Sequence, residues 1–229
     1  MKFFNGARDG IPVTLGYLSV GFGFGIYAAA SGLTPLQAFL ISITNLTSAG
    51  QVAGVDIMAT GGTYLEMALT QLVINLRYAL MAIALSQKLA ESFHTPHRLL
   101  VSHGITDEIF AVAHAQSGKL VPHYMYGLIF ISAAAWTGGT LLGAVAGEIM
   151  PQVISDAMGI MLYAMFLAVI IPTAKKERGV FVVICIAALG GILFHYLLAM
   201  VSSGFAVIIS AIVAAAVGAW LFPVAKEEE

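Results

Sequence analysis

The sequence has 229 residues, of which 59% are hydrophobic and only 10% are charged, with a formal net charge of −2. A soluble domain carries about 25% charged residues, so a chain this poor in charge could not cover a surface exposed to water. The composition therefore excludes an ordinary soluble domain and predicts an all-α polytopic membrane protein. Residues 1–229 are expected to form one transmembrane domain with no soluble domain.

Apolar runs of about 20 residues predict the membrane segments, and we expect about 6–8 of them. In chain order they are 11–30, 36–60, 64–87, 99–116, 124–147, 157–174, 180–200 and 205–222. The second run is interrupted by the polar letters TNLTSAGQ, and the fourth is short and contains SHGITDE. We therefore expect a broken or re-entrant segment near 36–60.

The positions of Lys and Arg leave two topologies open. If 36–60 enters from the outer face and returns to it, all the flanking positive charges lie on one face, which the positive-inside rule makes cytoplasmic. These charges are Lys2, Arg8, Lys88, Arg98, Lys119, Lys175, Lys176, Arg178 and Lys226. If 36–60 and 99–116 both cross the membrane, Lys88 and Arg98 lie outside. Both topologies keep the two termini in the cytoplasm.

The stretch ITNLTSAGQVAG supplies the first set of candidate substrate-binding residues. Irregular backbone at membrane depth must be buried in protein or line a cavity, and transporters use the ends of broken helices to bind substrate. The alternative is a kinked helix whose hydroxyl groups bond to its own backbone. The candidates here are Asn45, Thr47, Ser48, Ala49, Gly50 and Gln51.

Arg77 lies near the middle of the run 64–87, where an unpaired arginine costs about 2.5–3.5 kcal/mol on insertion scales. Its candidate partners are Asp56, Asp107 and Glu108. Two roles stay open: Arg77 donates to free carbonyls of the broken segment, or it binds a substrate carboxylate with its planar fork. We count Arg77, with the nearby Asn75, among the candidate substrate-binding residues.

Four ionisable residues are candidates for coupling or gating: Glu66, Asp107, Glu108 and His195. An intramembrane carboxylate with a raised pKa is able to carry a coupling proton, whereas the alternative for Asp107 and Glu108 is a solvated turn. The alternative for His195 is a hydrogen-bonded packing residue. His103 and Asp107 have the spacing of a metal pair but lack a third ligand, so we expect no metal site and no cofactor.

Several motifs in fixed order resemble the AzlC-type branched-chain amino acid exporters. They are GARDGIP, GYLSVGFGFGIYAAASGL, TSAGQ, INLRYALMAIALS and TDEIFA, and they cover most of residues 5–120. The matching positions include the Ala49–Gln51 stretch, the Asn75–Arg77 stretch and the acidic pair 107–108. Tyr78 departs from the pattern, because a histidine is common at that position, so no histidine role transfers to this chain.

The resemblance implies a multi-pass protein of a prokaryotic cell (inner) membrane that exports leucine, isoleucine, valine or similar apolar amino acids. It also implies a small AzlD-type membrane subunit as partner, and we expect a proton gradient to drive the transport. No nucleic acid partner is expected. A channel or passive pore for small polar solutes is the alternative function. An intramembrane hydrolase is disfavoured, because no motif of an activated serine with a histidine base stands out, and Ser48 has no histidine near it in the sequence.

Overall fold

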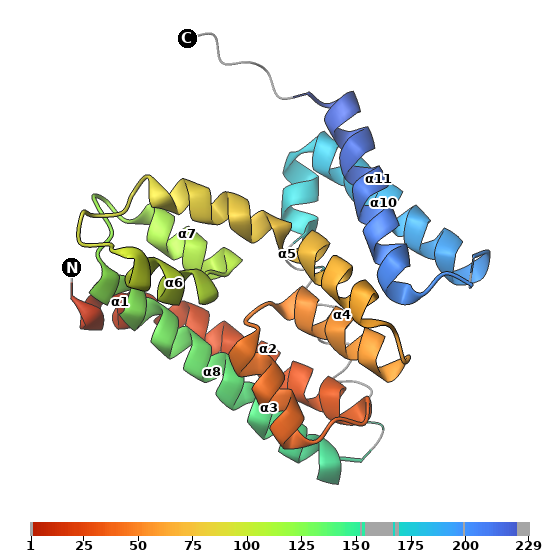
Figure 1. Ribbon diagram of the computed structural model, residues 1–229, viewed down its shortest axis with the longest axis horizontal. Helices are drawn as coiled ribbons and strands as arrows, with labels where there is room; N and C mark the ends of the chain where they lie inside the picture. The colour runs from red at the N-terminus through yellow and green to blue at the C-terminus, as the bar shows by residue number, and fades with distance from the viewer. Residues whose placement is uncertain (1, 152, 154–166, 168–169, 199, 224–229) are drawn as a thin grey trace. The chain divides into compact units, whose positions relative to one another are not determined.

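The computed structural model describes residues 2–151, 153, 167, 170–198 and 200–223. All regular elements in these ranges are helices, apart from one isolated bridge between Leu89 and Leu120. The helices are α1 (Phe3–Asp9), α2 (Ile11–Ala30), α3 (Pro35–Thr44), α4 (Ser48–Ala59), α5 (Tyr64–Ser86), α6 (Thr95–His103), α7 (Asp107–Ala115), α8 (Pro122–Ile149), α10 (Arg178–Tyr196) and α11 (Ser203–Leu221) (Figure 1).

Five of these helices, α2, α5, α8, α10 and α11, are long and apolar enough to cross a membrane. The prediction of an all-α polytopic membrane protein is confirmed. The predicted segment 157–174 lies largely outside the described residues. The predicted segment 99–116 is not one helix but two, α6 and α7, separated at residues 104–106.

The chain divides into two compact units. Unit 1 comprises Met1–Val55 and Ile74–Leu162, and unit 2 comprises Asp56–Val73 and Tyr163–Glu229. Helices α4 and α5 therefore each contribute to both units. We describe each unit by itself.

The backbone of unit 1 is built on α2 and α8, which pack closely and run parallel. Glycines make the close approach possible: Gly21 and Gly25 on α2 lie against the backbone of Trp136 and Thr140, and Gly143 on α8 lies against Phe22. Small residues at such positions let transmembrane helices approach at backbone distance. Residue numbers rise together along the contact, so both helices begin at the same end of the unit.

The second half of α5 runs antiparallel to α8. Its last turns pack into a buried cluster with the first turns of α8, since Leu85, Leu120 and Met125 belong to one core. Tyr78, two turns earlier, contacts Thr47 instead. Helix α5 therefore ends where α8 begins.

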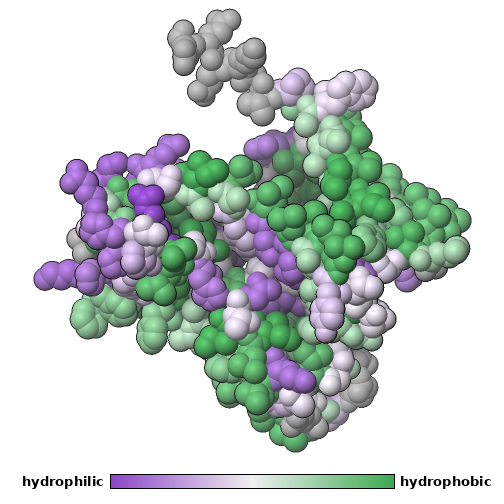
Figure 2. Space-filling view, viewed as in Figure 1, coloured by the Kyte–Doolittle hydropathy of each residue, from purple (hydrophilic) through white to green (hydrophobic). Residues whose placement is uncertain are grey.

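The loops at this end of unit 1 are joined and carry positive charge. Lys88 donates to the carbonyls of His114 and Gln116, and Lys119 donates to the carbonyl of Gln87. We call this end, with Lys88, Lys119 and the nearby α1, the basic end. Hydrophilic side chains gather there in the space-filling view (Figure 2), whereas apolar side chains cover most of α10 and α11.

In unit 2, α10 and α11 form an antiparallel pair. Gly190 lies against Ser210, and Gly218 lies against Val183, so residue numbers fall along α11 as they rise along α10. Both helices are strongly apolar, with mean hydropathies of 2.2 and 2.3.

Candidate functional site

Two interruptions in the helices of unit 1 frame the candidate site. The first break, residues 45–47, separates α3 from α4, and the second break, residues 104–106, separates α6 from α7. Helix α3 begins with a capping box between Thr34 and Gln37 and a proline in its first turn. It ends at Asn45, whose backbone is extended.

At the first break the chain turns back on itself. Gln51, in the first turns of α4, donates from Nε2 to the hydroxyl of Ser42 near the end of α3, at 3.1 Å. Figure 1 shows α4 leaving the break at a sharp angle to α3. We call α3 and α4 the first hairpin.

At the second break the chain also turns back on itself. Helix α6 begins near the basic end, where His97 Nδ1 lies 2.6 Å from the hydroxyl of Tyr126. Helix α7 ends there too, because Gln116, which caps it, donates to the carboxylate of Asp9 at 3.2 Å. Helices α6 and α7 therefore form a second hairpin, which starts and finishes at the basic end.

The two hairpins meet at their breaks. His103, the last residue of α6, lies with Nε2 3.0 Å from the carbonyl oxygen of Ile43 in the last turn of α3. Thr106, the N-cap of α7, accepts from the backbone N–H of Ile109 and contacts the hydroxyl of Tyr17 on α2. Thr, Asp and Glu at a helix start satisfy the free N–H groups and the helix dipole, which explains why TDE begins α7.

Arg77 and Asp107 form an ion pair between α5 and the start of α7. Nη1 of Arg77 lies 2.8 Å from Oδ2 of Asp107, and the two side chains remain 45% and 44% exposed. Of the three candidate partners, Asp107 is the one that pairs with Arg77 in the structure. Arg77 lies about 14 Å from the end of α5 and about 20 Å from its beginning, so the pair belongs to the middle of the helix.

Tyr78 connects this ion pair to the first break. Nη2 of Arg77 donates to the Tyr78 hydroxyl at 3.3 Å, and that hydroxyl donates to Oγ1 of Thr47 at 3.2 Å. The guanidinium also lies over the Tyr78 ring, with Cζ 5.0 Å from the ring centroid. Arg77 is thus linked to both breaks, to one directly and to the other through a single hydroxyl.

Glu108 faces α2 rather than the guanidinium. The Tyr17 hydroxyl donates to Oε2 of Glu108 at 2.5 Å. The neighbours Asp107 and Glu108 consequently have different partners, as their angular separation on a helix requires.

Gln51 lies in a buried network away from the exposed pair. Its Oε1 accepts from the indole N–H of Trp136 at 3.0 Å, and its Nε2 donates to Ser42, which in turn pairs with Thr140 at 2.8 Å. Gln51 is only 1% exposed. Its hydrogen bonds fix the first hairpin against α8.

The other predicted residues of the first break lie around it. Asn45 caps the end of α3, and Ser48, Ala49 and Gly50 form the first turn of α4. Asn75 is half-buried on α5, two residues before Arg77.

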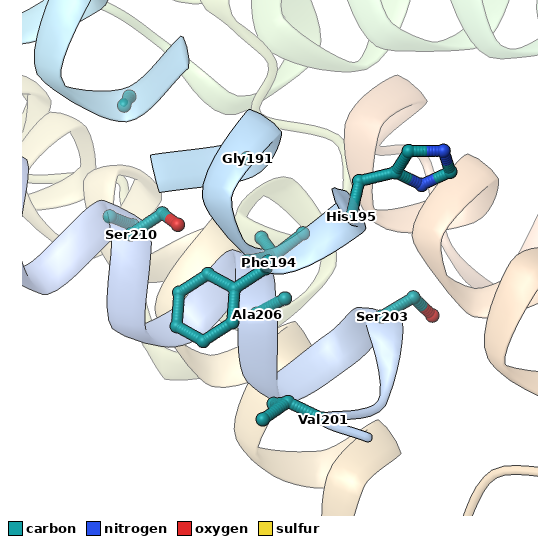
Figure 3. A pocket seen from close by; sticks show the side chains of 10 residues that line it. Gly191, Phe194, His195, Val201, Ser203, Ala206 and Ser210 are labelled. Atoms are coloured by element: carbon teal, nitrogen blue, oxygen red, sulfur yellow. The ribbon is translucent and has the colours of Figure 1, made fainter. Parts of the chain in front are cut away.

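Two predicted coupling residues lie in unit 2 instead. Glu66 is 3% exposed and accepts from the backbone N–H of Gly204 at the start of α11, at 2.9 Å, which is a favourable place for a carboxylate. His195 is on α10, where its ring packs edge-to-face against the ring of Tyr196. It borders a pocket of about 600 Å³ between α10 and α11 (Figure 3), in which its ring and that of Phe194 point in different directions.

Sequence reasoning missed Tyr17, Tyr78 and Trp136, which supply the polar bridges of unit 1. Each is an aromatic residue in an apolar run, so its hydroxyl or indole N–H leaves no trace in hydropathy. The one available signal was the need of a buried Tyr or Trp for a hydrogen-bond partner.

The fold and the site define a class, the polytopic α-helical membrane proteins in which broken helices meet at a charged pair. The chain belongs to the AzlC family: the family described as "AzlC protein" matches residues 12–150. This is a membrane transport family, so the chain has a transporter-like role in a membrane.

Named relatives agree with this assignment. The chain is 27% identical to the inner membrane protein YgaZ of Escherichia coli K12 over 198 residues, which are 83% of this chain and 81% of the relative. It is 29% identical to an uncharacterized membrane protein of Archaeoglobus fulgidus over 178 residues, covering 77% and 78% of the two chains. An uncharacterized membrane protein of Helicobacter pylori J99 is 22% identical over 214 residues, 87% and 92% of the two chains. No solved structure matches the chain.

Proposed function

We propose that this protein exports branched-chain or similar apolar amino acids across a prokaryotic inner membrane by alternating access. The observation that carries the proposal is the meeting of two helix breaks at the half-exposed Arg77–Asp107 pair. Broken helices of this kind present free N–H groups at one end and free carbonyls at the other. An amino acid requires donors for its carboxylate and acceptors for its ammonium group.

The two hairpins enter the membrane from opposite faces. Support comes from the parallel course of α2 and α8 and the antiparallel course of the second half of α5. With those directions, the first hairpin leaves from and returns to the outer face, and the second does so at the basic end. The positive-inside rule makes the basic end cytoplasmic, and we assign both termini to that side.

An apolar pocket next to the second break suits the side chain of the substrate. It measures about 290 Å³ and is lined by α5, α6 and α8, including Ile105 of the second break, Leu85 and Met125. Burial of an isobutyl group is worth about 1.5–3 kcal/mol. The pocket lies on the cytoplasmic side of the ion pair, where an exporter loads its cargo.

Export against a gradient requires an energy source, and we propose that this source is a proton gradient, with Glu108 at the start of α7 as the proton carrier. The family resemblance adds a small AzlD-type membrane subunit as partner.

Purified protein, with and without the partner, reconstituted in lipid vesicles tests the proposal. Vesicles preloaded with unlabelled leucine should accumulate labelled leucine transiently and saturably, and an imposed pH gradient should alter the rate. A current proportional to voltage without saturable exchange would instead establish a channel, the alternative function. Release of cleaved products would establish an enzyme.

A further inference from the structure

We infer that Arg77 and Asp107 are the two halves of a zwitterion site, in which Arg77 binds the substrate carboxylate and Asp107 binds the substrate ammonium group. This inference rests on the proposed function and adds the requirement that one ligand carries both a carboxylate and an ammonium group. It also assigns Asp107 to substrate rather than to coupling.

The exposure of the ion pair is the first argument. An ion pair made only for structure would be expected to lie buried among hydrogen-bonding partners, yet almost half of each of these side chains is accessible. At the middle of a membrane helix that accessible surface is expected to meet water, a ligand or another polar protein surface, because a charge facing lipid is costly. The pair is thus accessible to a ligand.

Charge balance is the second argument. In the described residues Arg77 has one ion-pair partner, Asp107, so the empty protein neutralises each charge with the other. Removing one member of the pair leaves the other charge uncompensated at membrane depth, which is unfavourable. A zwitterion inserted between them replaces one ion pair with two, so both protein charges stay compensated in the empty and the loaded states.

The surroundings of each charge match the two ends of the ligand. Arg77 is linked through the Tyr78 hydroxyl to Thr47, directly before the N-terminal end of α4, and the N–H groups at a helix start favour a carboxylate. At the other end, the carboxylate of Asp107 by itself supplies the acceptor for the ammonium group, because Glu108 accepts from Tyr17 and faces α2.

A ligand with only one charge lacks this balance. It would take one partner from the ion pair and leave the other protein charge unmatched. Leucine should therefore bind at least about 10-fold tighter than 4-methylpentanoate, which lacks the amino group, or 3-methylbutylamine, which lacks the carboxylate. Both analogues keep the apolar part of leucine, so the comparison isolates the charges.

The test measures the binding of these three ligands to the purified full chain, by calorimetry, in the wild type and in Arg77→Gln and Asp107→Asn. Arg77→Gln should weaken leucine about 10- to 100-fold and leave 3-methylbutylamine unchanged or tighter, because Asp107 no longer has an internal partner. Asp107→Asn should weaken leucine similarly and leave 4-methylpentanoate unchanged or tighter. Arg77→Lys should recover part of the leucine affinity, because it keeps the charge but loses the planar fork.

The double variant Arg77→Gln, Asp107→Asn controls for folding, since it removes both charges and keeps two groups able to pair. It should melt near the wild type and bind all three ligands weakly. Equal weakening of leucine and 3-methylbutylamine by Arg77→Gln, in protein that melts normally, would overturn the inference. If the wild type still exchanged leucine normally in vesicles, that result would overturn the inference alone and leave the proposed function standing. Wild-type protein that neither binds nor exchanges leucine would contradict both the inference and the proposed function.

Discussion

At the scale of single residues, the polar groups of unit 1 fall into two sets with different environments. Arg77 and Asp107 are half-exposed, whereas Gln51, Ser42 and Thr140 are almost completely buried. Buried polar groups are costly unless each is hydrogen-bonded, and this network satisfies its members through Trp136. The exposed set is suited to exchange partners, and the buried set to hold the first hairpin in place.

Gln51→Ala should therefore act on stability. It removes the acceptor of the Trp136 N–H and the donor to Ser42, and it leaves a cavity. The free energy of unfolding should fall by about 2–4 kcal/mol, measured by denaturant titration in micelles. The dissociation constant for leucine should change less than about threefold at a temperature where the variant is folded.

Ser48→Ala is the matched comparison, because Ser48 begins α4 three residues earlier and is only half-buried. Its melting temperature should stay near that of the wild type, and any effect should appear in leucine affinity. A Gln51→Ala protein with unchanged melting and lost leucine binding would contradict this structural role and show that Gln51 contacts the substrate.

At the scale of whole helices, the α2–α8 contact is the scaffold on which both hairpins rest. The first hairpin reaches it through Ser42 and Gln51, and the second reaches it through Thr106 and Tyr17. The scaffold depends on glycines at which a Cβ would collide with the backbone of the facing helix. The distance between α2 and α8 therefore sets the position of the candidate site.

Gly143→Ala should separate these helices, because the added Cβ would collide with the backbone of Phe22. Overpacking of this kind costs about 1–3 kcal/mol. The control is Gly138→Ala on the same helix, where a Cβ meets nothing within 4 Å, and which should be neutral or stabilising by up to about 1 kcal/mol. Unfolding followed by tryptophan fluorescence measures both, and equal effects of the two changes would contradict the role of this contact.

The hairpins make a second prediction at this scale, which concerns membrane sidedness. In a Cys185→Ala background, Ser31→Cys and Tyr64→Cys should react with an impermeant thiol reagent from outside the cell. Glu91→Cys and Ser117→Cys should react only from the cytoplasmic side.

Two full crossings in place of hairpins would give another pattern. Ser31→Cys would then share its side with Glu91→Cys, and Tyr64→Cys with Ser117→Cys. No cysteine is placed at Gly32 or Gly62, which lie close to Ser31 and Tyr64 in the sequence. Gly32 has a φ of +88°, and a side chain at Gly62 would crowd Ile57 and Glu66.

At the scale of the whole molecule, an apolar protein whose described residues contain the ion pair Arg77–Asp107 suits a cargo that is apolar and carries two opposite charges. In the zwitterion site that we infer, the ion pair binds the two charges that all amino acids share, so we propose that the apolar pocket bordered by Leu85, Ile105 and Met125 discriminates among amino acids.

Leucine should accordingly compete with labelled leucine about 10-fold or more better than alanine does, because it buries three more carbon atoms at about 0.8 kcal/mol each. Inhibition of exchange in vesicles measures this ratio. Equal inhibition by alanine, lysine and leucine would contradict an apolar specificity pocket.

The sequence by itself determined the class of protein, because hydropathy is a local property that each span carries in its own residues. The run 11–30 has the bounds of α2, and the polar letters TNLTSAGQ mark the place where α3 gives way to α4. The motifs likewise led to the AzlC family. These features depend on residues near one another in the chain, and periodicity and composition report on them directly.

Only the tertiary structure decided which residues meet. It chose Asp107 among the candidate partners of Arg77, split the run 99–116 into two helices, and joined Gln51 to Trp136 across 85 positions of sequence. It also assigned Glu66 and His195 to unit 2 and the ion pair to unit 1. The physical reason is that side-chain pairing depends on how the helices pack. Packing is set by long-range contacts such as those of Gly25 and Gly143. The hydropathy of a single segment contains no information about such contacts.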